Sequence, residues 1–549
     1  MNFGNVKYAY FSMEVGLSAK IPTYSGGLGI LAGDTLKAAA DVGLPMIGVT
    51  LLTKHGYFFQ NIEDDKQNET PMSWSVDDFL QPVDSKVALK ISGQDVSIGC
   101  WKYEIKGIHG HIVPVLFLHT DLEENSEEIR ALSNDLYGDG RGYRLGQEII
   151  LGIGGVKMLE KLGLTNISRY HLNEGHSALL ALELERTLKD PEKVKQKCIF
   201  TTHTPVPAGH DTFPMDMVKE LLDPEYCNIL AEEFHTKGVL NMTSLALNSS
   251  NYINGVAQKH TEISKTMFPN YPIHSITNGV HAPTWVSAPF ANLYDKYIRH
   301  WREDPYSLRY ASNISLSEIW DAHFSAKKRI IDYTNAYSNA GMDYDFFTIG
   351  WARRFTSYKR PDFLFDDIDR LNQIAEKHGP IQVIFGGKAH PKDTEGKKLI
   401  SAVIKMSKEL TEKGNGKIKT AYLTNYDMYL GQLITSGVDV WLNTPEPPHE
   451  ASGTSGMKCA LNGVPHLSIR DGWWEEGCIE GETGWSFVTP DDLYAVLDNK
   501  ILPLFHNDAD GWRSLMRKTI MLNGSFFNAT RMLHEYVSRA YNGGSPITF

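Results

Sequence analysis

The chain has 549 residues, more than one hydrophobic core usually supports, so at least two domains are expected. Its 42% hydrophobic and 22% charged residues are typical of a globular protein, and its net charge of −12 argues against a general nucleic-acid-binding role. No apolar run approaches the roughly 18 residues of a membrane span, and the N-terminus lacks a signal-peptide pattern. Five widely spaced cysteines indicate free thiols in a reducing, cytoplasmic compartment.

In the first half of the chain, short apolar runs alternate with helical patterns, which is typical of α/β proteins with parallel sheets. Strands are predicted at residues 6–13, 111–119, 167–172 and 198–202. Helices are predicted at residues 34–42, 148–162 and 177–188. The first strand leads into a glycine-rich segment at residues 25–29.

The second half repeats this alternation. Strands are predicted at residues 345–351, 380–385, 418–423 and 438–443. Helices are predicted at residues 394–410, with Asp393 or Thr394 as the cap, and at 426–436. The fold class is therefore α/β, with two doubly wound, Rossmann-like domains facing a central cleft. The expected domains are residues 1–285 and 286–549, and the second includes a helical bridge to about residue 344.

Residues 450–458 place a carboxylate, four small residues and a lysine close together. The carboxylate is Glu450, and the small residues are Ser452, Gly453, Thr454 and Ser455. Because Lys458 follows Thr454 by four residues, both should lie on one face of a helix. Amides at a helix N-terminus bind anions, so a phosphate held at Thr454 would leave the rest of its molecule near the Lys458 amine. This arrangement suits a lysine joined through a Schiff base to pyridoxal 5'-phosphate.

This segment resembles the cofactor segment of the α-glucan phosphorylases that act on glycogen, starch or maltodextrin. The family segment usually reads Glu-Ala-Ser-Gly-Thr-Gly-Asn-Met-Lys, and here Ser455 and Gly456 replace the Gly-Asn pair. Alone, the segment also fits an ordinary Gly/Ser loop with a solvated lysine. Further motifs in family order across residues 6–490 favour the phosphorylase interpretation. The resemblance is closest to short forms without a regulatory N-terminal extension and implies the glycosyltransferase B-type fold.

Residues 353–360 carry four cations after a predicted strand. Arginine binds phosphate through two parallel hydrogen bonds, although a bare cluster of this kind is more often a solvated loop. The cluster resembles the family segment Lys-Arg-x-x-x-Tyr-Lys-Arg. The resemblance implies that Arg354 and Lys359 hold the substrate phosphate and that Tyr358 touches the sugar. Arg353 stands where the family usually has lysine. The resemblance implies that this replacement keeps the positive charge and shifts the contacts of the side chain toward the cofactor phosphate.

Three other segments resemble family landmarks. In the glycine-rich segment, the resemblance implies that the Gly27 amide approaches the phosphates and that Leu28 lies near the sugar. At residues 170–178, it implies that His176 bonds the sugar 6-hydroxyl and turns its carbonyl toward the anomeric carbon. At residues 277–285, it implies that Asn278 bonds the 6-hydroxyl and that Trp285 lies near the cofactor ring.

Two observations qualify these assignments. A lone buried histidine is usually satisfied by backbone groups, and a metal site built from histidines lacks coherent ligand spacing, so no metal is expected. The histidines in question are His171, His176, His203 and His210. Asp427 also departs from the family, because it stands where animal enzymes have an arginine near the cofactor phosphate.

The resemblance implies reversible phosphorolysis of α-1,4-glucan to glucose 1-phosphate with retained configuration. A glycosidase needs two carboxylates beside the bond, and this sequence offers one, Glu450, which together with Ser452 and Gly453 would contact the sugar. The cofactor's phosphate, with a second pKa of about 6, would supply the acid and base instead. The implied partners are α-glucan, inorganic phosphate and glucose 1-phosphate, with a homodimer and without a nucleic acid or membrane.

Two alternatives remain. A nucleotide-sugar-dependent glucosyltransferase, similar to glycogen synthase, often has two glutamates eight positions apart here, whereas this chain has Lys458 eight positions after Glu450. A non-catalytic glucan-binding protein of the same fold would be indicated by loss of Lys458, Arg354 or Lys359, and all three are present.

Overall fold

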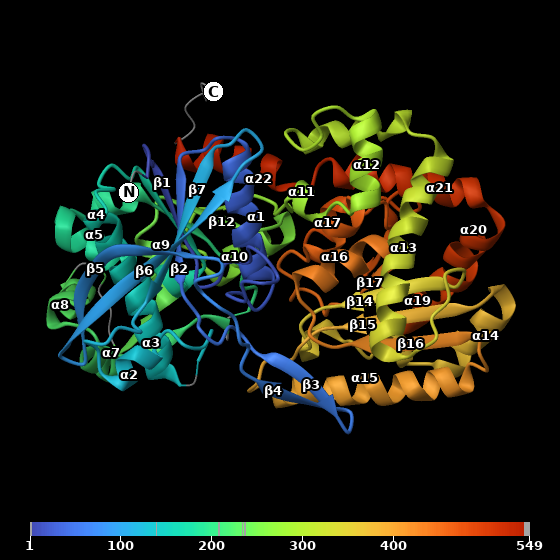
Figure 1. The fold of residues 1–549 in the computed structure, drawn as a ribbon, viewed down its shortest axis with the longest axis horizontal. Helices are drawn as coiled ribbons and strands as arrows, with labels where there is room; N and C mark the ends of the chain where they lie inside the picture. Colours follow the sequence, from blue (N-terminus) through green and yellow to red (C-terminus); the bar gives the residue numbers. More distant parts are fainter. Residues whose placement is uncertain (1–2, 139, 207–208, 233, 235–237, 543–549) are drawn as a thin grey trace. The chain divides into compact units, whose positions relative to one another are not determined.

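The computed structural model describes residues 3–138, 140–206, 209–232, 234 and 238–542, which fall into two compact units (Figure 1). Unit 1 comprises Met1–Phe58, Pro71–Thr277 and Met532–Phe549, and unit 2 comprises Phe59–Thr70 and Asn278–Arg531. The division after Thr277 precedes the boundary that we expected after residue 285. The reason is local, because the backbone of Val280 exchanges hydrogen bonds with Phe527 and Ala529 of unit 2.

Unit 1 is built on a nine-stranded sheet in the order β13-β12-β9-β8-β1-β2-β7-β6-β5. The strands from β13 to β7 are parallel, and β6 and β5 extend one edge antiparallel. Its strands are β1 (Tyr8–Phe11), β2 (Met46–Leu51), β5 (Gln81–Ile91), β6 (Gln94–Lys106), β7 (Ile112–His119), β8 (Arg169–Asn173), β9 (Cys198–Thr201), β12 (Tyr252–Gly255) and β13 (Ile273–Ser275). A small separate sheet pairs β10 (Thr212–Pro214) with β11 (Val239–Asn241).

The helices of unit 1 are α1 (Gly27–Asp41), α2 (Glu127–Ala131), α3 (Arg141–Ile149), α4 (Gly155–Lys161), α5 (Leu180–Leu188), α6 (Pro191–Lys197), α7 (Met215–Leu221), α8 (Pro224–Glu232), α9 (Met242–Asn248) and α10 (Gln258–Met267). The helix predicted at 148–162 is divided between α3 and α4 by a π-helical turn at Ile150–Gly154. Glycine is required next to this turn, since a Cβ at Gly155 would lie 2.5 Å from Cε1 of Phe11 on β1.

Unit 2 contains a six-stranded, fully parallel sheet in the order β16-β15-β14-β17-β18-β19. Its strands are β14 (Phe347–Ala352), β15 (Ile381–Gly386), β16 (Ile418–Leu423), β17 (Val440–Asn443), β18 (His466–Ile469) and β19 (Gly484–Phe487). With β14 as the first strand, this is the doubly wound order 3-2-1-4-5-6. The predicted α/β class with parallel sheets is confirmed.

The helices of unit 2 are α11 (Ala282–Trp285), α12 (Ala288–Tyr297), α13 (Leu316–Ser338), α14 (Ile368–His378), α15 (Thr394–Lys413), α16 (Met428–Gly437), α17 (Ser455–Ala460), α18 (Trp474–Gly477), α19 (Pro490–Val496), α20 (Leu502–Asn507) and α21 (Ala509–Thr519). Asp393 caps α15, since its carboxylate accepts a hydrogen bond from the Gly396 amide at 2.8 Å. The last helix, α22 (Ala529–Tyr536), runs from unit 2 into unit 1.

A hairpin from the N-terminal part of the sequence belongs to unit 2. It consists of β3 (Phe59–Glu63) and β4 (Lys66–Thr70), and Figure 1 shows it beside α15. The backbone amide of Gln60 donates to the Asn425 side chain, and the Gln67 side chain donates to the Ala389 carbonyl at 2.9 Å. These contacts explain why the hairpin joins a unit whose other residues begin more than 200 positions later.

A buried ion pair fixes α13 to the sheet of unit 2. The Asp439 carboxylate accepts hydrogen bonds from Lys327 at 2.6 Å, from His323 at 2.9 Å and from the Thr348 amide at 2.7 Å. Burial alone would raise the pKa of Asp439, but Lys327 and His323 hold it below its usual value. The carboxylate therefore stays charged and joins the helix to β14.

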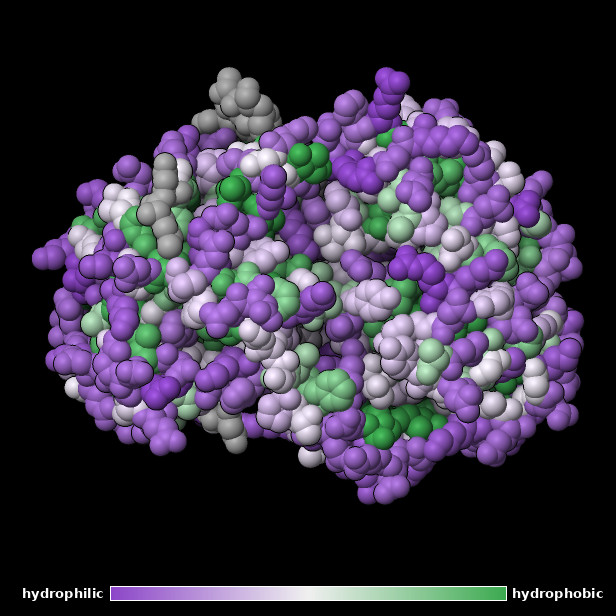
Figure 2. Space-filling view, in the orientation of Figure 1, coloured by the Kyte–Doolittle hydropathy of each residue, from purple (hydrophilic) through white to green (hydrophobic). Residues whose placement is uncertain are grey.

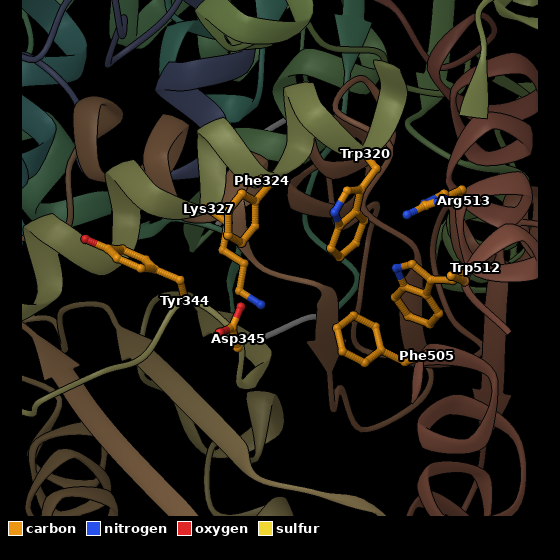
Figure 3. Close-up of a pocket in the computed structure, with 9 residues that line it drawn as sticks. Trp320, Phe324, Lys327, Tyr344, Asp345, Phe505, Trp512 and Arg513 are labelled. Atoms are coloured by element: carbon orange, nitrogen blue, oxygen red, sulfur yellow. The ribbon is translucent and has the colours of Figure 1, made fainter. Parts of the chain in front are cut away.

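A cavity of about 190 Å³ lies next to this ion pair, between α13, α20 and α21 (Figure 3). Its walls are mainly aromatic and include Trp320, Phe324, Phe505 and Trp512, together with Lys327 and Asp345. None of the site residues predicted from the sequence lines this cavity.

The visible face in Figure 2 is mostly hydrophilic, with apolar residues in small scattered groups. Within the described ranges, no helix is long and apolar enough to cross a membrane. All five cysteines lie in the described part of the chain and are free thiols.

We expect the Asp439→Asn variant to lower the free energy of unfolding of unit 2 by about 3–5 kcal/mol, because it leaves Lys327 buried without its counter-charge. Thermal unfolding followed by calorimetry measures this change. The Glu409→Gln variant removes one partner of an exposed i,i+4 pair on α15 and should cost no more than about 0.5 kcal/mol. Equal effects of the two variants would contradict the anchoring role of Asp439.

Candidate active site

The strand order of unit 2 reverses between β14 and β17, and the loops that follow these two strands therefore start at the same edge of the sheet. In doubly wound folds, ligands bind at this switch point, outside the carboxyl ends of the strands. The loop after β14 carries the cationic segment 353–360, and the loop after β17 carries Glu450. The topology thus joins two sequence motifs that lie about 90 residues apart.

Glu450 binds two of the four cations directly. One of its oxygens, Oε2, accepts from Arg353 Nη2 at 2.5 Å and from Lys359 Nζ at 2.6 Å. All three side chains are buried, whereas Arg354 is exposed. Burial alone would raise the pKa of Glu450, but the two cations lower it to about 2. Glu450 is therefore a carboxylate that stays charged at neutral pH and lies between two buried cations.

A second carboxylate supports this loop. Asp471 accepts hydrogen bonds from the backbone amides of Glu450 and Gly472 at 2.8 and 2.9 Å. Burial raises the pKa of Asp471 to about 6. Since its two oxygens hold backbone amides, Asp471 positions the Glu450 loop.

The small-residue segment leads into α17, as the sequence pattern indicates. Gly453 has φ of +84°, a conformation that favours glycine. The Lys458 amide donates to the Thr454 carbonyl at 3.3 Å, so the two residues are one helical turn apart. Ser455 is the first residue of α17, and its hydroxyl accepts from the Trp441 indole N–H at 3.2 Å.

Lys458 is buried against an aromatic ring. Its Nζ lies 3.8 Å from the centre of the Trp285 ring, and both side chains are in unit 2. Asn462 donates to the Trp285 and Lys458 carbonyls at 2.9 and 3.0 Å, which joins α11 to α17. Lys458 and Trp285, which are 173 positions apart in the sequence, are thereby brought together.

Several buried polar atoms near this segment have no hydrogen-bond partner within the described ranges. They include Arg353 Nη1, Asn443 Oδ1, Ser452 Oγ, His466 Nδ1, Trp473 Nε1 and Trp474 Nε1. Buried polar groups are nearly always paired, so such a concentration calls for an explanation, and a bound ligand is one. Asn278 Oδ1 is also buried without a partner among these residues.

Tyr358 lies next to the ion cluster. Lys359 Nζ is 4.5 Å from the centre of its ring, and the Tyr358 carbonyl accepts from the Glu446 amide at 2.7 Å. Burial alone would raise the pKa of Tyr358, but Lys359 and Arg354 lower it. Asp427 caps α16 through the Leu430 amide at 2.8 Å.

In unit 1 the strand order reverses between β1 and β8. Glu14, which follows β1, accepts from the amides of Ser25 at 2.5 Å and Gly26 at 3.2 Å and thereby holds the glycine-rich segment. Gly27 is exposed and begins α1 with no side-chain cap, and Leu28 is half-buried. Glu14 was not predicted as a site residue.

His176 follows β8 and lies beside an ion pair of unit 1, formed by Arg144 and Asp211. Its Nε2 is 3.6 Å from Asp211 Oδ2, and Asp211 also binds Arg144 at 2.9 Å. Burial and the nearby Arg144 lower the pKa of His176 to about 3, so the ring is neutral at pH 7. Among the described residues, no group of three or more His, Cys, Asp and Glu side chains is placed to hold a metal ion.

Other polar residues that were not predicted as site residues also belong to these loops. His203, after β9, contacts Asn173 at 2.6 Å, and its amide donates to Glu174 at 2.7 Å. In unit 2 the missed residues are Asp471, His466 and Trp473. The available signal was their position after or at the start of a strand, but no spacing pattern linked them to the other motifs.

Comparison with known proteins agrees with this geometry. A model of the carbohydrate phosphorylase family matches residues 228–476. A maltodextrin phosphorylase from Thermococcus litoralis is 36% identical, with coverage of 97% of this chain and 70% of the relative. Glycogen phosphorylases from Aquifex aeolicus and Mycobacterium tuberculosis are each 33% identical over 97% of this chain, which corresponds to 86% and 70% of those relatives.

The chain therefore belongs to the carbohydrate phosphorylase family, and the resemblance seen in the sequence is confirmed. It is an enzyme of the glycosyltransferase type.

We expect the charge of Glu450 to stabilise the protein in a pH-dependent way. Its pKa falls from 4.5 to about 2 on folding, so the stabilisation is complete above pH 4.5 and is lost as the pH falls through 2. The difference in thermal midpoint between the native protein and Glu450→Gln should be constant from pH 7 to 5 and shrink below pH 4.5. Glu446→Gln, in the same loop, is the control and should show no such trend. A pH-independent difference for Glu450→Gln would contradict the ion cluster.

Proposed function

We propose that this protein catalyses the reversible phosphorolysis of α-1,4-glucan, with inorganic phosphate as cosubstrate and glucose 1-phosphate as product, and with retention of configuration. The names of its relatives, maltodextrin phosphorylase and glycogen phosphorylase, support the substrate class. The observation that carries the proposal is the buried cluster of Arg353, Lys359 and Glu450 at the switch point of unit 2, near a buried lysine.

The residues around Lys458 fit pyridoxal 5'-phosphate. Lys458 would carry the cofactor covalently, and Trp285 would lie along its ring. The phosphate would be held by Arg353 and by the small-residue segment, that is, by Gly453, Thr454 and Ser455. The orphaned Nη1 of Arg353 and Oγ of Ser452 support this assignment, because a phosphate offers the acceptors that a buried guanidinium N–H requires.

When bound, the cofactor's phosphate group, with a second pKa of about 6, supplies an acid and base that works near neutral pH. The protein's own residues bind and orient the reactants. Lys359 and Arg354 would bind the substrate phosphate, Lys359 as a point charge and Arg354 through two parallel hydrogen bonds. The fixed negative charge of Glu450 keeps Arg353 and Lys359 in place and would bind sugar hydroxyls together with Ser452 and Gly453.

The sugar contacts of Tyr358, Asn278, His176 and Leu28 and the phosphate contact of Gly27 stay predictions. A homodimer and a cytoplasmic location also stay predictions from the resemblance.

The direct test of the proposal is borohydride reduction after incubation with pyridoxal 5'-phosphate, followed by peptide mass spectrometry. We expect a pyridoxyl group on Lys458 alone. Lys458→Ala should lose the label and at least about 100-fold of the turnover, which is the scale of general acid–base catalysis. Lys458→Arg, which keeps the positive charge beside Trp285, should lose both as well. Full phosphorolysis by a folded Lys458→Ala protein would reject the role assigned to this lysine. Native protein that is folded but carries no label on Lys458 and shows no phosphorolysis would favour nucleotide-sugar transfer or glucan binding alone.

A second test concerns the phosphate. We expect Arg354→Ala to raise the KM for inorganic phosphate and for glucose 1-phosphate by about 10- to 100-fold, because a charge-assisted hydrogen bond contributes about 1.5–3 kcal/mol. The KM for glucan should change little. Arg370→Ala removes an arginine paired with Asp491 and serves as the control. Unchanged phosphate kinetics in Arg354→Ala would show that the phosphate assignment is wrong.

A further inference from the structure

Gly456 lies in the part of the small-residue segment that departs from the family pattern, and the structure explains why it has no side chain. A Cβ at Gly456 would lie 2.8 Å from Nδ1 of His466 and 2.7 Å from Cζ2 of Trp473. Both rings are buried. The space that a side chain at position 456 would occupy is therefore filled by the edges of two rings that come from β18 and from the loop after it.

The indole N–H of Trp473 faces this segment. Its Cδ1 atom is 3.4 Å from the Cβ position of Gly453, and its Cζ2 atom is 2.7 Å from that of Gly456. In an indole, Nε1 is bonded to Cδ1 and to the carbon that carries Cζ2, so the N–H edge runs along residues 453–456. Nε1 is buried and has no hydrogen-bond partner among the residues that the structure describes. The Trp473 ring packs edge-on against the ring of Phe527, and the two ring centres are 4.8 Å apart.

The imidazole of His466 presents a second donor. Its Nε2 lies 3.4 Å from Nδ2 of Asn443. With Nε2 as the acceptor of this amide N–H, the ring proton is on Nδ1. Burial lowers the pKa of His466 to about 3, so the ring is neutral at pH 7. Nδ1, which faces Gly456, is buried and without a partner in the described ranges.

We propose that the ring N–H groups of His466 and Trp473 donate hydrogen bonds to a phosphate oxygen held at residues 453–456, in place of a side chain at position 456. The phosphate is the one on pyridoxal 5'-phosphate, so this inference rests on the proposed function. Arg353, whose Nη1 is also unpaired, supplies positive charge to the same region. Glu450 carries one negative charge against the two cations Arg353 and Lys359, so a sugar would leave one positive charge unbalanced, whereas a phosphate monoester meets both this charge and the neutral donors.

The experiment compares the affinity of the apoprotein for pyridoxal 5'-phosphate and for pyridoxal, which lacks the phosphate, by absorbance titration. Trp473→Phe and His466→Phe keep an aromatic ring and remove the N–H. We expect each to bind pyridoxal 5'-phosphate about 10- to 100-fold more weakly while binding pyridoxal as the native protein does. His466→Asn, which places an amide nitrogen near the position of Nδ1, should recover most of this loss.

Trp512→Phe is the matched control, because Trp512 is equally buried and its Nε1 is also without a partner in the described ranges, but it lines the separate cavity between α13, α20 and α21. It should leave the ratio of the two affinities unchanged. A parallel titration measures the affinity for inorganic phosphate in protein whose cofactor has been fixed to Lys458 by borohydride reduction. Trp473→Phe should leave this affinity unchanged. A selective loss of inorganic phosphate binding in that arm would overturn the assignment to the cofactor.

Two results separate failure of this inference from failure of the proposed function. If native protein shows no label on Lys458, the proposed function is wrong, and the inference that rests on it is wrong as well. If native protein is labelled but the folded His466→Phe and Trp473→Phe variants keep the native ratio of the two affinities, the rings serve only for packing and the inference is wrong.

Discussion

The single carboxylate of Glu450 is the interaction on which the proposed site depends. Arg353 and Lys359 are buried at the switch point of unit 2, and both bind the same oxygen of Glu450. A cation left buried without its partner typically costs about 3–5 kcal/mol, so the two cations could not stay in place without this carboxylate. The loop that carries Glu450 is fixed in turn by Asp471, which binds its backbone amide.

The topology explains why this cluster forms where it does. Since β14 and β17 are neighbours in the sheet, the loops that leave their carboxyl ends meet, although two strands, β15 and β16, and three α-helices, α14, α15 and α16, separate them in the sequence. The same reversal between β1 and β8 in unit 1 places the glycine-rich segment and His176 on loops of adjacent strands. Each unit thus presents its motifs at its own switch point, as expected for doubly wound sheets.

The features of the fold and of the site that depend on neighbouring residues could be predicted from the sequence. The strand at 418–423 has the predicted limits, and Asp393 caps α15. The hairpin β3–β4 could not be assigned to unit 2, because its contact between Gln60 and Asn425 spans 365 residues. In the site, the spacing of Thr454 and Lys458 is visible in the sequence, whereas the sharing of one Glu450 oxygen by two cations depends on the strand order.

The difference between a buried cation and a neutral N–H donor explains how the proposed phosphate site can stay folded without its ligand. Each further buried cation would need a counter-charge whenever the anion is absent, and Glu450 already serves two. A neutral N–H left unpaired costs only about 1–3 kcal/mol and needs no counter-charge. Donors such as the rings of His466 and Trp473 can therefore add hydrogen bonds to a bound phosphate without the cost of another buried cation.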